Sequence, residues 1–394
     1  MRIAAVDPFY VRMPEITDAA DGTQDSFLVR VRTDDGLEGW GESDASPLVS
    51  TAAYCCPMSH GNIVNIRESL LGETVDGPED VVRLHAKATR QGMDIQQIHH
   101  AYSAADIALW DVVGKKLGRP VYRLLDGASS KSFPKRPYAS VLFGDTPELT
   151  RKRAEGLRQD GFTAAKFGWG PMGKHGREND VALVREARAG LGPEAELLID
   201  AGVVWGRDWQ TAHQRAADFA PFRPGWLEEP LLGDAVDAYR KLVTRKPAVP
   251  IAAGEGSGRY RDAEDLLLNG GVHFIQIDVG RIGGITPAHR VRKLAEEHAV
   301  TYVNHTFKSH VSIAASIHVF AAVEAFRLLE YVQGGSPMSR ALVSDPLLRG
   351  PDGLVRAPER PGLGITVDRE AVRKYLAPVR IEAGGRTVFE QADP

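Results

Sequence analysis

From about residue 135 onward, the sequence alternates short apolar runs with amphipathic stretches of helical period. The apolar runs are 138–143, 163–167, 196–200, 225–228, 249–253, 273–278, 301–304 and 326–331. The stretches between them that place apolar residues on one helical face are 147–159, 180–189, 208–219, 235–243, 288–298 and 309–323. Strands that alternate with helices predict parallel pairing, and this many βα units predict a closed (β/α) barrel. A doubly wound open sheet is the alternative on this pattern alone.

The segments before and after this region have a different pattern. Residues 26–33 alternate like a half-buried strand, a turn signal follows at 34–36, and 39–42 reads as a second strand. A helix is expected around 103–114, ended by Gly118-Arg119-Pro120. We therefore predict three parts: an N-terminal α+β unit (1–130), a barrel (131–340) and a Pro- and Gly-rich segment (341–394) that packs back on the first unit.

Composition excludes several classes of protein. The net charge of −4 gives no electrostatic footprint for nucleic acid or an anionic membrane. No apolar run approaches the roughly 20 residues that span a bilayer, and the N-terminus reaches an acid and a proline too soon for a secretory signal. Cys55 and Cys56 are adjacent and cannot join distant segments. We expect a cytoplasmic protein, assembled as a homo-oligomer, that binds a small molecule.

Polar residues stand at or just beyond the ends of seven of the apolar runs. They are Lys166, Asp200, Glu228, Glu255, Asp278, His305 and Glu330. Active-site groups of (β/α) barrels lie at the C-terminal ends of the strands. One such residue alone would be a strand-end capping group, but seven that are each about one βα unit apart predict a common site at the mouth of the barrel.

Three of the seven are acids from consecutive strands: Asp200, Glu228 and Glu255. Crowded carboxylates repel one another unless a cation neutralises them. Magnesium suits an all-oxygen ligand set and keeps positions for water or substrate. Because strand side chains alternate, only one of Glu228 and Glu229 can point inward. We assign Glu228, which shares the parity of Trp226, and leave Glu229 as a supporting group.

The other four predict proton transfer at a carbon next to a carboxylate. Lys166 and His305 come from strands on either side of the acids, so they can flank the α-carbon of a bound carboxylate. Asp278 is placed to orient the imidazole, and a lysine beside a divalent cation has a lowered pKa. Protonated Glu330 could hydrogen-bond the enediolate that forms when the proton leaves.

Seven motifs, spread over nearly the whole chain, carry a family resemblance. They are Thr33-Asp34-Asp35-Gly36 with Gly39-Trp40-Gly41-Glu42, Asp106-Ile107-Ala108-Leu109-Trp110-Asp111 with Gly114-Lys115, Leu227-Glu228-Glu229-Pro230, Gly254-Glu255-Gly256, Asp278 with Arg281-Ile282-Gly283-Gly284-Ile285-Thr286, Asn304-His305-Thr306, and Leu329-Glu330-Tyr331. Together they resemble the enolase superfamily, and within it the mandelate racemase subgroup. The resemblance implies a modified (β/α)8 TIM barrel of the (β/α)7β type, with an α+β capping domain formed by the N-terminal region and the C-terminal segment.

The resemblance also implies roles for the site residues. Asp200, Glu228 and Glu255 would bind Mg²⁺, and Lys166 would be a base. Asp278 and His305 would form a dyad, and Glu330 would be the electrophilic acid. Two positions depart from the racemase pattern: Ala164 stands in place of a first lysine, and Gly202 in place of an asparagine.

These departures favour an acid-sugar dehydratase, which removes water to give a 2-keto-3-deoxy acid. Racemisation or epimerisation is the second hypothesis, and a barrel that binds a ligand without turnover is the third. Cycloisomerisation fits the motifs less well.

Loops of the capping domain at 14–25 and 46–61 would close over the substrate, with Tyr54 and His60 as candidate contacts. The glycine-rich loop 169–176 could line the mouth or merely connect.

Overall fold

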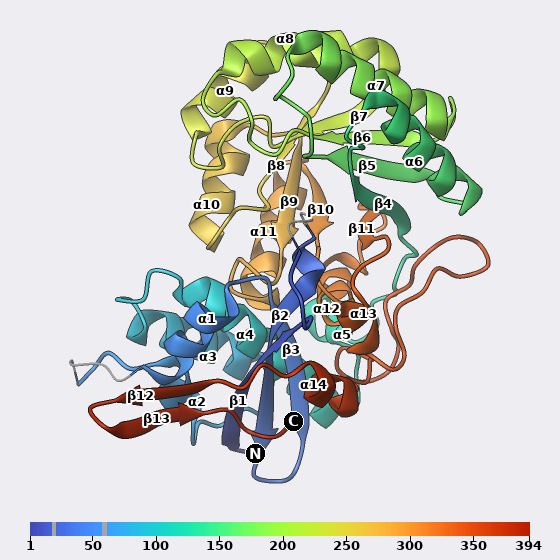
Figure 1. Cartoon of the computed structure of the whole chain (residues 1–394). Helices are drawn as coiled ribbons and strands as arrows, with labels where there is room; N and C mark the ends of the chain where they lie inside the picture. The colour runs from blue at the N-terminus through green and yellow to red at the C-terminus, as the bar shows by residue number, and fades with distance from the viewer. Residues whose placement is uncertain (18–20, 57–60) are drawn as a thin grey trace.

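The computed structural model describes residues 1–17, 21–56 and 61–394. Figure 1 shows a barrel of strands ringed by helices, with a smaller unit of helices and sheet beside it. In the described ranges, no helix is both long enough and apolar enough to cross a membrane.

The barrel is a single sheet of eight parallel strands. These are β4 (Arg136–Leu142), β5 (Ala164–Gly168), β6 (Glu196–Asp200), β7 (Pro224–Glu228), β8 (Ile251–Ala253), β9 (Phe274–Asp278), β10 (Thr301–His305) and β11 (Leu328–Val332). The seven strands from β4 to β10 lie side by side in chain order, and β11 pairs with β4. The sheet therefore curls round to bring β10 next to β11. This order confirms the predicted barrel, because a doubly wound sheet would reverse direction.

Helices cover the outside of the barrel. They are α6 (Pro147–Gln159), α7 (Arg177–Leu191), α8 (Trp209–Phe219), α9 (Val236–Thr244), α10 (Tyr260–Asp265), α11 (Ile285–Glu297) and α12 (His310–Phe320), with short 3₁₀ and π segments at Ala220–Phe222 and Leu266–Gly270. All were predicted except α10 and the π segment after it. Ala263 is the one buried side chain of α10, so the segment has too little apolar periodicity to be read as a helix.

The N-terminal unit is a three-stranded antiparallel sheet covered by helices. Its elements are β1 (Ile3–Arg12), a 3₁₀ turn (Gly22–Gln24), β2 (Asp25–Thr33), β3 (Glu38–Ser43), α1 (Pro47–Cys55), α2 (Ile66–Leu70), α3 (Pro78–Gln91), α4 (Ile98–Leu117) and α5 (Val121–Leu125). The β2–β3 hairpin and α4 were predicted, and α4 ends at Gly118 with φ 63°. Strand β1 was missed; it is an edge strand, which tolerates Pro8. A loop was expected at 46–61, but helix α1 (Pro47–Cys55) forms most of its first part.

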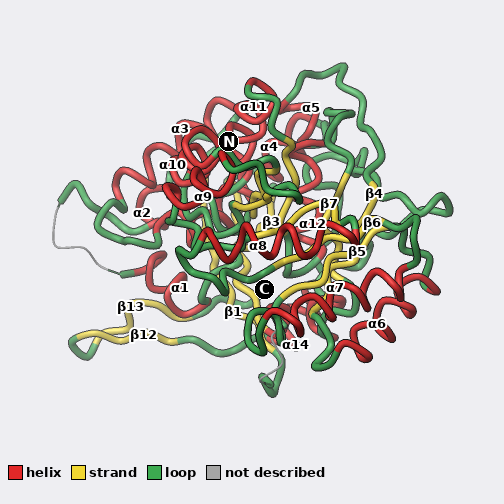
Figure 2. The backbone as a smooth tube through the Cα atoms, turned by 90° about the horizontal axis from the view of Figure 1, so that it is seen from above, coloured by secondary structure: helices red, strands yellow, loops and turns green. Residues whose placement is uncertain are grey.

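The C-terminal segment returns to the N-terminal sheet. It contains α13 (Pro337–Ala341), α14 (Arg369–Tyr375) and a hairpin of β12 (Arg380–Ala383) and β13 (Arg386–Glu390), which was not predicted. The amide of Ala377 donates to the Tyr10 carbonyl, and Arg30 donates to the Asp393 carbonyl. Figures 1 and 2 both show the hairpin on the β1 side of the molecule. These contacts agree with the expected packing, while the domain boundaries remain a prediction.

Two carboxylates of the N-terminal unit join it to the barrel. Glu42 on β3 accepts hydrogen bonds from the backbone and hydroxyl groups of Ser309 and Ser312, at the start of α12. Asp106 on α4 accepts from the amide and hydroxyl of Thr286, at the start of α11. The first amides of a helix lack partners within it and attract negative charge. Helices α11 and α12 are thus each capped by a carboxylate from the N-terminal unit.

Candidate active site

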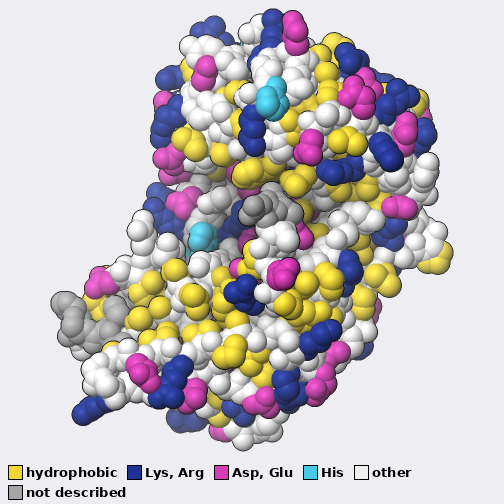
Figure 3. Space-filling model, viewed as in Figure 1, with side chains coloured by type: hydrophobic (Ala, Val, Ile, Leu, Met, Phe, Trp, Pro, Cys, Tyr) yellow, Lys and Arg dark blue, Asp and Glu magenta, His cyan; other side chains and the backbone are white. Residues whose placement is uncertain are grey.

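A cavity of about 220 Å³ lies at the C-terminal ends of the barrel strands, where the barrel meets the N-terminal unit. Figure 3 shows the surface hollowed at this junction, with acidic and basic side chains gathered along it. Five of the seven predicted residues line the cavity: Lys166, Asp200, Glu255, His305 and Glu330. The other two, Glu228 and Asp278, contact this group directly. The structure therefore brings all seven together.

The three acids predicted to bind metal form one cluster. Asp200, Glu228 and Glu255 each offer a carboxylate oxygen within 4.8 Å of the others, and all three side chains are buried. Burial raises the pKa of Asp200 to about 6 and holds that of Glu228 well above its usual range. Asp200 and Glu228 are thus poorly compensated, whereas His305 and Arg281 outweigh burial and lower the pKa of Glu255 to about 2. Hard oxygens in this state fit a divalent cation such as Mg²⁺.

Glu229 points away from the cluster, as the strand parity predicted. Its Oε1 accepts from the amide of Gly254 at 3.4 Å, and the side chain lines a separate hollow outside the barrel. Glu228 shares its face with Trp226, whose indole Nε1 donates to Glu228 Oε2 at 2.8 Å. The choice of Glu228 as the inward-facing residue is confirmed.

Lys166 lies among the acids. Its Nζ is 2.5 Å from Glu228 Oε1 and 2.8 Å from Glu330 Oε1, and 3.9 Å from Asp200 Oδ2. Burial alone would lower the pKa of Lys166, but the charges of Glu228 and Glu330 outweigh it and hold the pKa above its usual range. The expectation of a lowered pKa assumed that a cation neutralises these acids. It concerns the metal-loaded protein and remains a prediction.

His305 and Asp278 form a close pair. The imidazole Nδ1 lies 2.6 Å from Asp278 Oδ2, and the other oxygen of Asp278 accepts from the amide of Gly280 at 2.6 Å. This orients Nε2 toward the cavity, 3.5 Å from Glu255 Oε2. Burial opposes the charged imidazole, but Glu255 and Glu330 raise the pKa of His305 to about 10. The pair thus has the geometry of an oriented proton donor or acceptor.

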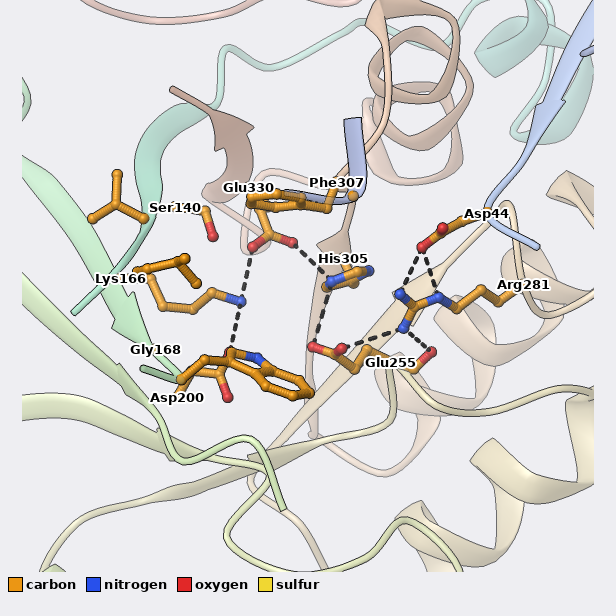
Figure 4. A pocket seen from close by; sticks show the side chains of 14 residues that line it. Asp44, Ser140, Lys166, Gly168, Asp200, Glu255, Arg281, His305, Phe307 and Glu330 are labelled. Atoms are coloured by element: carbon orange, nitrogen blue, oxygen red, sulfur yellow. Dashed lines mark hydrogen bonds and ion pairs between the residues drawn. The ribbon is translucent and has the colours of Figure 1, made fainter. Parts of the chain in front are cut away.

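Glu330 lies between the two nitrogen bases. One carboxylate oxygen faces Lys166 and the other is 4.0 Å from His305 Nε2. Figure 4 shows Lys166 and His305 on opposite sides of Glu330, both pointing into the pocket. Glu330 Oε2 accepts from the amide of Thr306 at 2.7 Å. Asn304 accepts from the Glu330 amide at 2.9 Å, so a side chain bridges β10 and β11 at the closure of the barrel.

The sequence interpretation missed an ionic network at the mouth. Arg281 contacts Asp44 Oδ2 at 2.6 Å and Glu255 Oε1 at 3.2 Å, and Figure 4 shows it between the two. Lys308 contacts Asp25 Oδ1 at 3.1 Å and Asp44 Oδ1 at 3.4 Å. Asp44 and Asp25 belong to the N-terminal unit, so nothing in the spacing of the barrel strands could have located them. Arg281 and Lys308 each lie three residues beyond a member of the dyad, which is the signal that was available.

The two departures from the racemase pattern have structural reasons. Ala164 lies in a buried layer beneath the site, packed with Tyr138, Leu198 and Trp226, among others. The rings of Tyr138 and Trp226 belong to this layer, and Ala164 itself is fully buried. Gly202 has φ 56°, and a Cβ there would lie 2.9 Å from the indole of Trp169.

The loops that were considered as walls of the site reach the cavity only in part. Trp169, at the start of the glycine-rich loop, lines the cavity, as does Gly22 of the 14–25 loop. Tyr54 as a substrate contact is wrong: it is fully buried and its hydroxyl donates to the Ala101 carbonyl at 3.0 Å. His60 lies outside the described residues.

Taken together, the geometry suits removal of a proton next to a carboxylate. Three buried acids could hold a divalent cation, a lysine and an oriented histidine face one volume, and a buried carboxyl group lies between them. Proton abstraction at such a carbon atom requires groups of these kinds, for charge stabilisation and for proton transfer.

Comparison with known proteins gives a consistent result. Residues 6–126 match the family model of the mandelate racemase/muconate lactonizing enzyme N-terminal domain, and residues 149–371 match that of the enolase C-terminal domain-like family. The D-galactarolactone cycloisomerase of Agrobacterium fabrum is 30% identical over 370 residues, 89% of this chain and 91% of the relative. The D-xylonate dehydratase of Haloferax volcanii is 29% identical over 405 residues, 97% of this chain and 92% of the relative.

Solved structures extend the comparison. A protein from Rhodobacter sphaeroides described as a predicted mandelate racemase superposes with a TM-score of 0.95 and 44% identity, covering 99% of both chains. A racemase from Streptomyces coelicolor with bound magnesium superposes with a TM-score of 0.79 and 25% identity, covering 95% of this chain and 100% of that chain.

Proposed function

Because this chain belongs to the enolase superfamily, in the mandelate racemase/muconate lactonizing enzyme group, we propose that it is a magnesium-dependent acid-sugar dehydratase. The substrate would lose the proton next to its carboxylate and then its 3-hydroxyl group, giving water and a 2-keto-3-deoxy acid. The relative named D-xylonate dehydratase, which matches nearly the whole chain, supports this reaction class.

One observation carries the proposal. The Glu330 carboxyl group lies between Lys166 Nζ at 2.8 Å and His305 Nε2 at 4.0 Å, beside the cluster of three acids. A substrate carboxylate held at the cluster would have its α-carbon in the volume that the two bases face. Both bases could then reach the same carbon from opposite sides.

Each of the seven site residues has a proposed role. Asp200, Glu228 and Glu255 hold Mg²⁺, which when bound supplies Lewis-acid stabilisation of the charge that develops on the substrate carboxylate. Lys166 or His305 takes the α-proton, depending on the configuration at C2, and His305 protonates the departing 3-hydroxyl. Asp278 keeps the imidazole oriented. Glu330 donates a hydrogen bond to the enediolate oxygen when protonated.

The test is incubation of the magnesium-loaded protein with a library of monocarboxylic and dicarboxylic acid sugars, assayed for 2-keto acid. We expect turnover of at least one member. If the protein binds Mg²⁺ but consumes no acid sugar, the proposal is wrong and the reading as a non-catalytic binding barrel gains support.

Lys166→Met tests the base. We expect kcat to fall about 10³-fold, within the usual range for loss of a general base. Lys135→Met is the matched control, because Lys135 is also buried but lies at the opposite end of the barrel, where its Nζ donates to the Val323 carbonyl. The control should keep the activity of the native protein. Equal losses in both variants would mean that Lys166 acts through stability alone.

Racemisation or epimerisation is the second candidate, and the observation that favours it is the placement of Lys166 and His305 on opposite sides of Glu330. Exchange of the α-proton for deuterium in heavy water, without loss of hydroxyl, would select it. The relative named as a cycloisomerase adds a third product to assay, a lactone ring opened or rearranged without release of water.

A further inference from the structure

Trp169 has an unusual backbone and an unusual exposure for its position. It follows β5 directly, lines the cavity, and has a φ of 55°, in the left-handed region. A bulky residue without glycine's freedom pays strain of about 1 kcal/mol or more there. Its side chain is 47% exposed, so burial of the ring does not compensate the strain. Strained residues concentrate where a side chain must be aimed at a ligand.

The neighbouring strand end makes room for this ring. Gly202, after β6, has φ 56°, and a Cβ on it would lie 2.9 Å and 3.1 Å from Cδ2 and Cε2 of Trp169. The indole therefore packs directly on the Gly202 backbone. The amide of Gly202 donates to Asp200 Oδ1 at 2.8 Å, so the ring lies next to an acid of the proposed metal site. A flat apolar surface is thus held at the edge of the volume where chemistry is proposed.

Apolar side chains also contribute to the wall away from the acids, with the hydroxyl of Ser140 among them. Val141, Leu142 and Phe307 line the same cavity as Trp169. The cavity volume of about 220 Å³ is below the roughly 300–1,000 Å³ typical of pockets for drug-sized ligands, so a small acid fits it best.

Within the described part of the chain, the Lys and Arg side chains that line this cavity already have acidic partners. Arg281 is bound to Asp44 and Glu255. Lys308 donates to the Gly22 carbonyl at 2.6 Å and to Asp25 Oδ1 at 3.1 Å. Lys166 contacts the acids of the central cluster. Arg153, which donates to the Leu142 and Phe143 carbonyls, lines the adjoining hollow and not this cavity. A second substrate carboxylate held inside this cavity would lose its water without an unpaired cation beside it, which is unfavourable.

We propose that Trp169 is a specificity-determining residue whose indole forms the wall against the non-reacting carbon chain of a monocarboxylic acid sugar, with dicarboxylic acids discriminated against. This inference rests on the proposed function and adds the substrate class. The C–H faces of a sugar chain pack against an aromatic ring, whereas a terminal carboxylate in that place loses its hydration.

The test compares two pairs of acids that differ only at C6: D-gluconate with D-glucarate, and D-galactonate with D-galactarate. Affinities are measured by calorimetry on the magnesium-loaded Lys166→Met, His305→Asn protein, in which neither proposed base remains to consume the ligand. We expect the monocarboxylate of at least one pair to bind about tenfold more tightly than its partner.

Variants at Trp169 are then made in the same background. Trp169→Ala should weaken binding of the monocarboxylate about tenfold and reduce the preference within the pair, while Trp169→Phe should keep most of both. Trp209→Ala removes a partly exposed tryptophan of α8 that does not line the cavity, and should change neither affinity. Circular dichroism and Mg²⁺ titration check that each variant is folded and loaded.

Equal or tighter binding of the dicarboxylates, no effect of Trp169→Ala, or no binding of any of the four acids would overturn the inference. Failure of the proposed function is a separate result, because it appears as absence of turnover across the whole library. Turnover of a dicarboxylate alone would keep the dehydratase and reject the role of Trp169.

Discussion

The two ends of the barrel each contain a buried lysine, and their surroundings differ. At the mouth, Lys166 is surrounded by carboxylates, which hold its pKa above the usual range against the effect of burial. At the other end, just before β4, Lys135 has a carbonyl and the ring of Phe320 as neighbours, and burial lowers its pKa to about 7. The charged form of the same residue at similar depth is thus favoured by acids in one place and disfavoured by burial in the other.

The contrast continues within single strands. Two residues before Lys166, Asp200, Glu228, His305 and Glu330 come Ala164, Leu198, Trp226, Val303 and Leu328, on the same face and in one apolar cluster. We call this cluster, which also includes Tyr138 and Ala252, the inner layer. Two residues along each strand therefore separate the apolar inner layer from the layer of charged side chains. The acids therefore lie directly above an apolar floor, and Lys166 is the cation among them.

The largest expected effect comes from placing a charge in the inner layer. Ala164→Lys puts an ammonium among Tyr138, Leu198 and Trp226, one layer below acids that Lys166 already neutralises. We expect a loss of about 3–5 kcal/mol in unfolding free energy, measured by urea denaturation. Ala164→Met is the control for length without charge and should cost about 1–3 kcal/mol. Equal losses of unfolding free energy in the two variants would mean that the size of the new side chain, and not its charge, destabilises the protein.

The second effect concerns Lys135 and depends on pH. Its folded pKa of about 7 is below the value of about 10.5 of an unfolded lysine, so between these values the unfolded state binds more protons. Native stability therefore falls as pH decreases from 10.5 to 7 because of this group. Lys135→Met should be more stable than the native protein by about 1–3 kcal/mol at pH 7, and the gain should shrink toward pH 10. Exposed Lys152 on α6 is the control, and Lys152→Met should give no such trend. A gain independent of pH would mean that Lys135 is charged when folded.

The smallest effect tests the contact between the layers. Trp226→Phe keeps a ring but removes the N–H that donates to Glu228 Oε2. We expect Mg²⁺ affinity to fall about tenfold, measured by calorimetry, because donors behind metal ligands typically contribute this much. Tyr138→Phe removes a hydroxyl of the same layer that donates at 3.4 Å to the Asn304 carbonyl and contacts none of the three acids. Its Mg²⁺ affinity should be unchanged, and an equal loss in both variants would assign the effect to packing.

Much of the fold could be predicted because it depends on local patterns. Strands such as 196–200 are buried on both faces and read as continuous apolar runs, and helices such as 147–159 carry one apolar stripe. Strand β1 and the β12–β13 hairpin were missed for the opposite reason. Their partners are distant in sequence or their faces are exposed, so alternation is weak. Tertiary pairing, which no local window contains, decides such elements.

The site was predictable to the extent that it follows from the barrel. The seven strand-end residues converge because parallel strands bring their C-terminal ends to one rim. Asp44, by contrast, reaches the cavity from the N-terminal unit through its ion pair with Arg281, and Tyr54 turned inward to the core of that unit. Where one unit docks on another, side-chain direction depends on three-dimensional packing. The sequence therefore indicated the reacting groups better than the walls that select a substrate.

The capping of α11 and α12 by Asp106 and Glu42 limits how the barrel and the N-terminal unit can be exchanged between proteins. These helices follow β9 and β10, which end in Asp278 and His305. A barrel transplanted without its original cover would lose the acceptors of the Thr286 and Ser312 amides, directly behind the dyad, although Ser309 would still cap Val311. A chimaera that joins this barrel to another N-terminal unit would therefore need acids at the positions of Glu42 and Asp106.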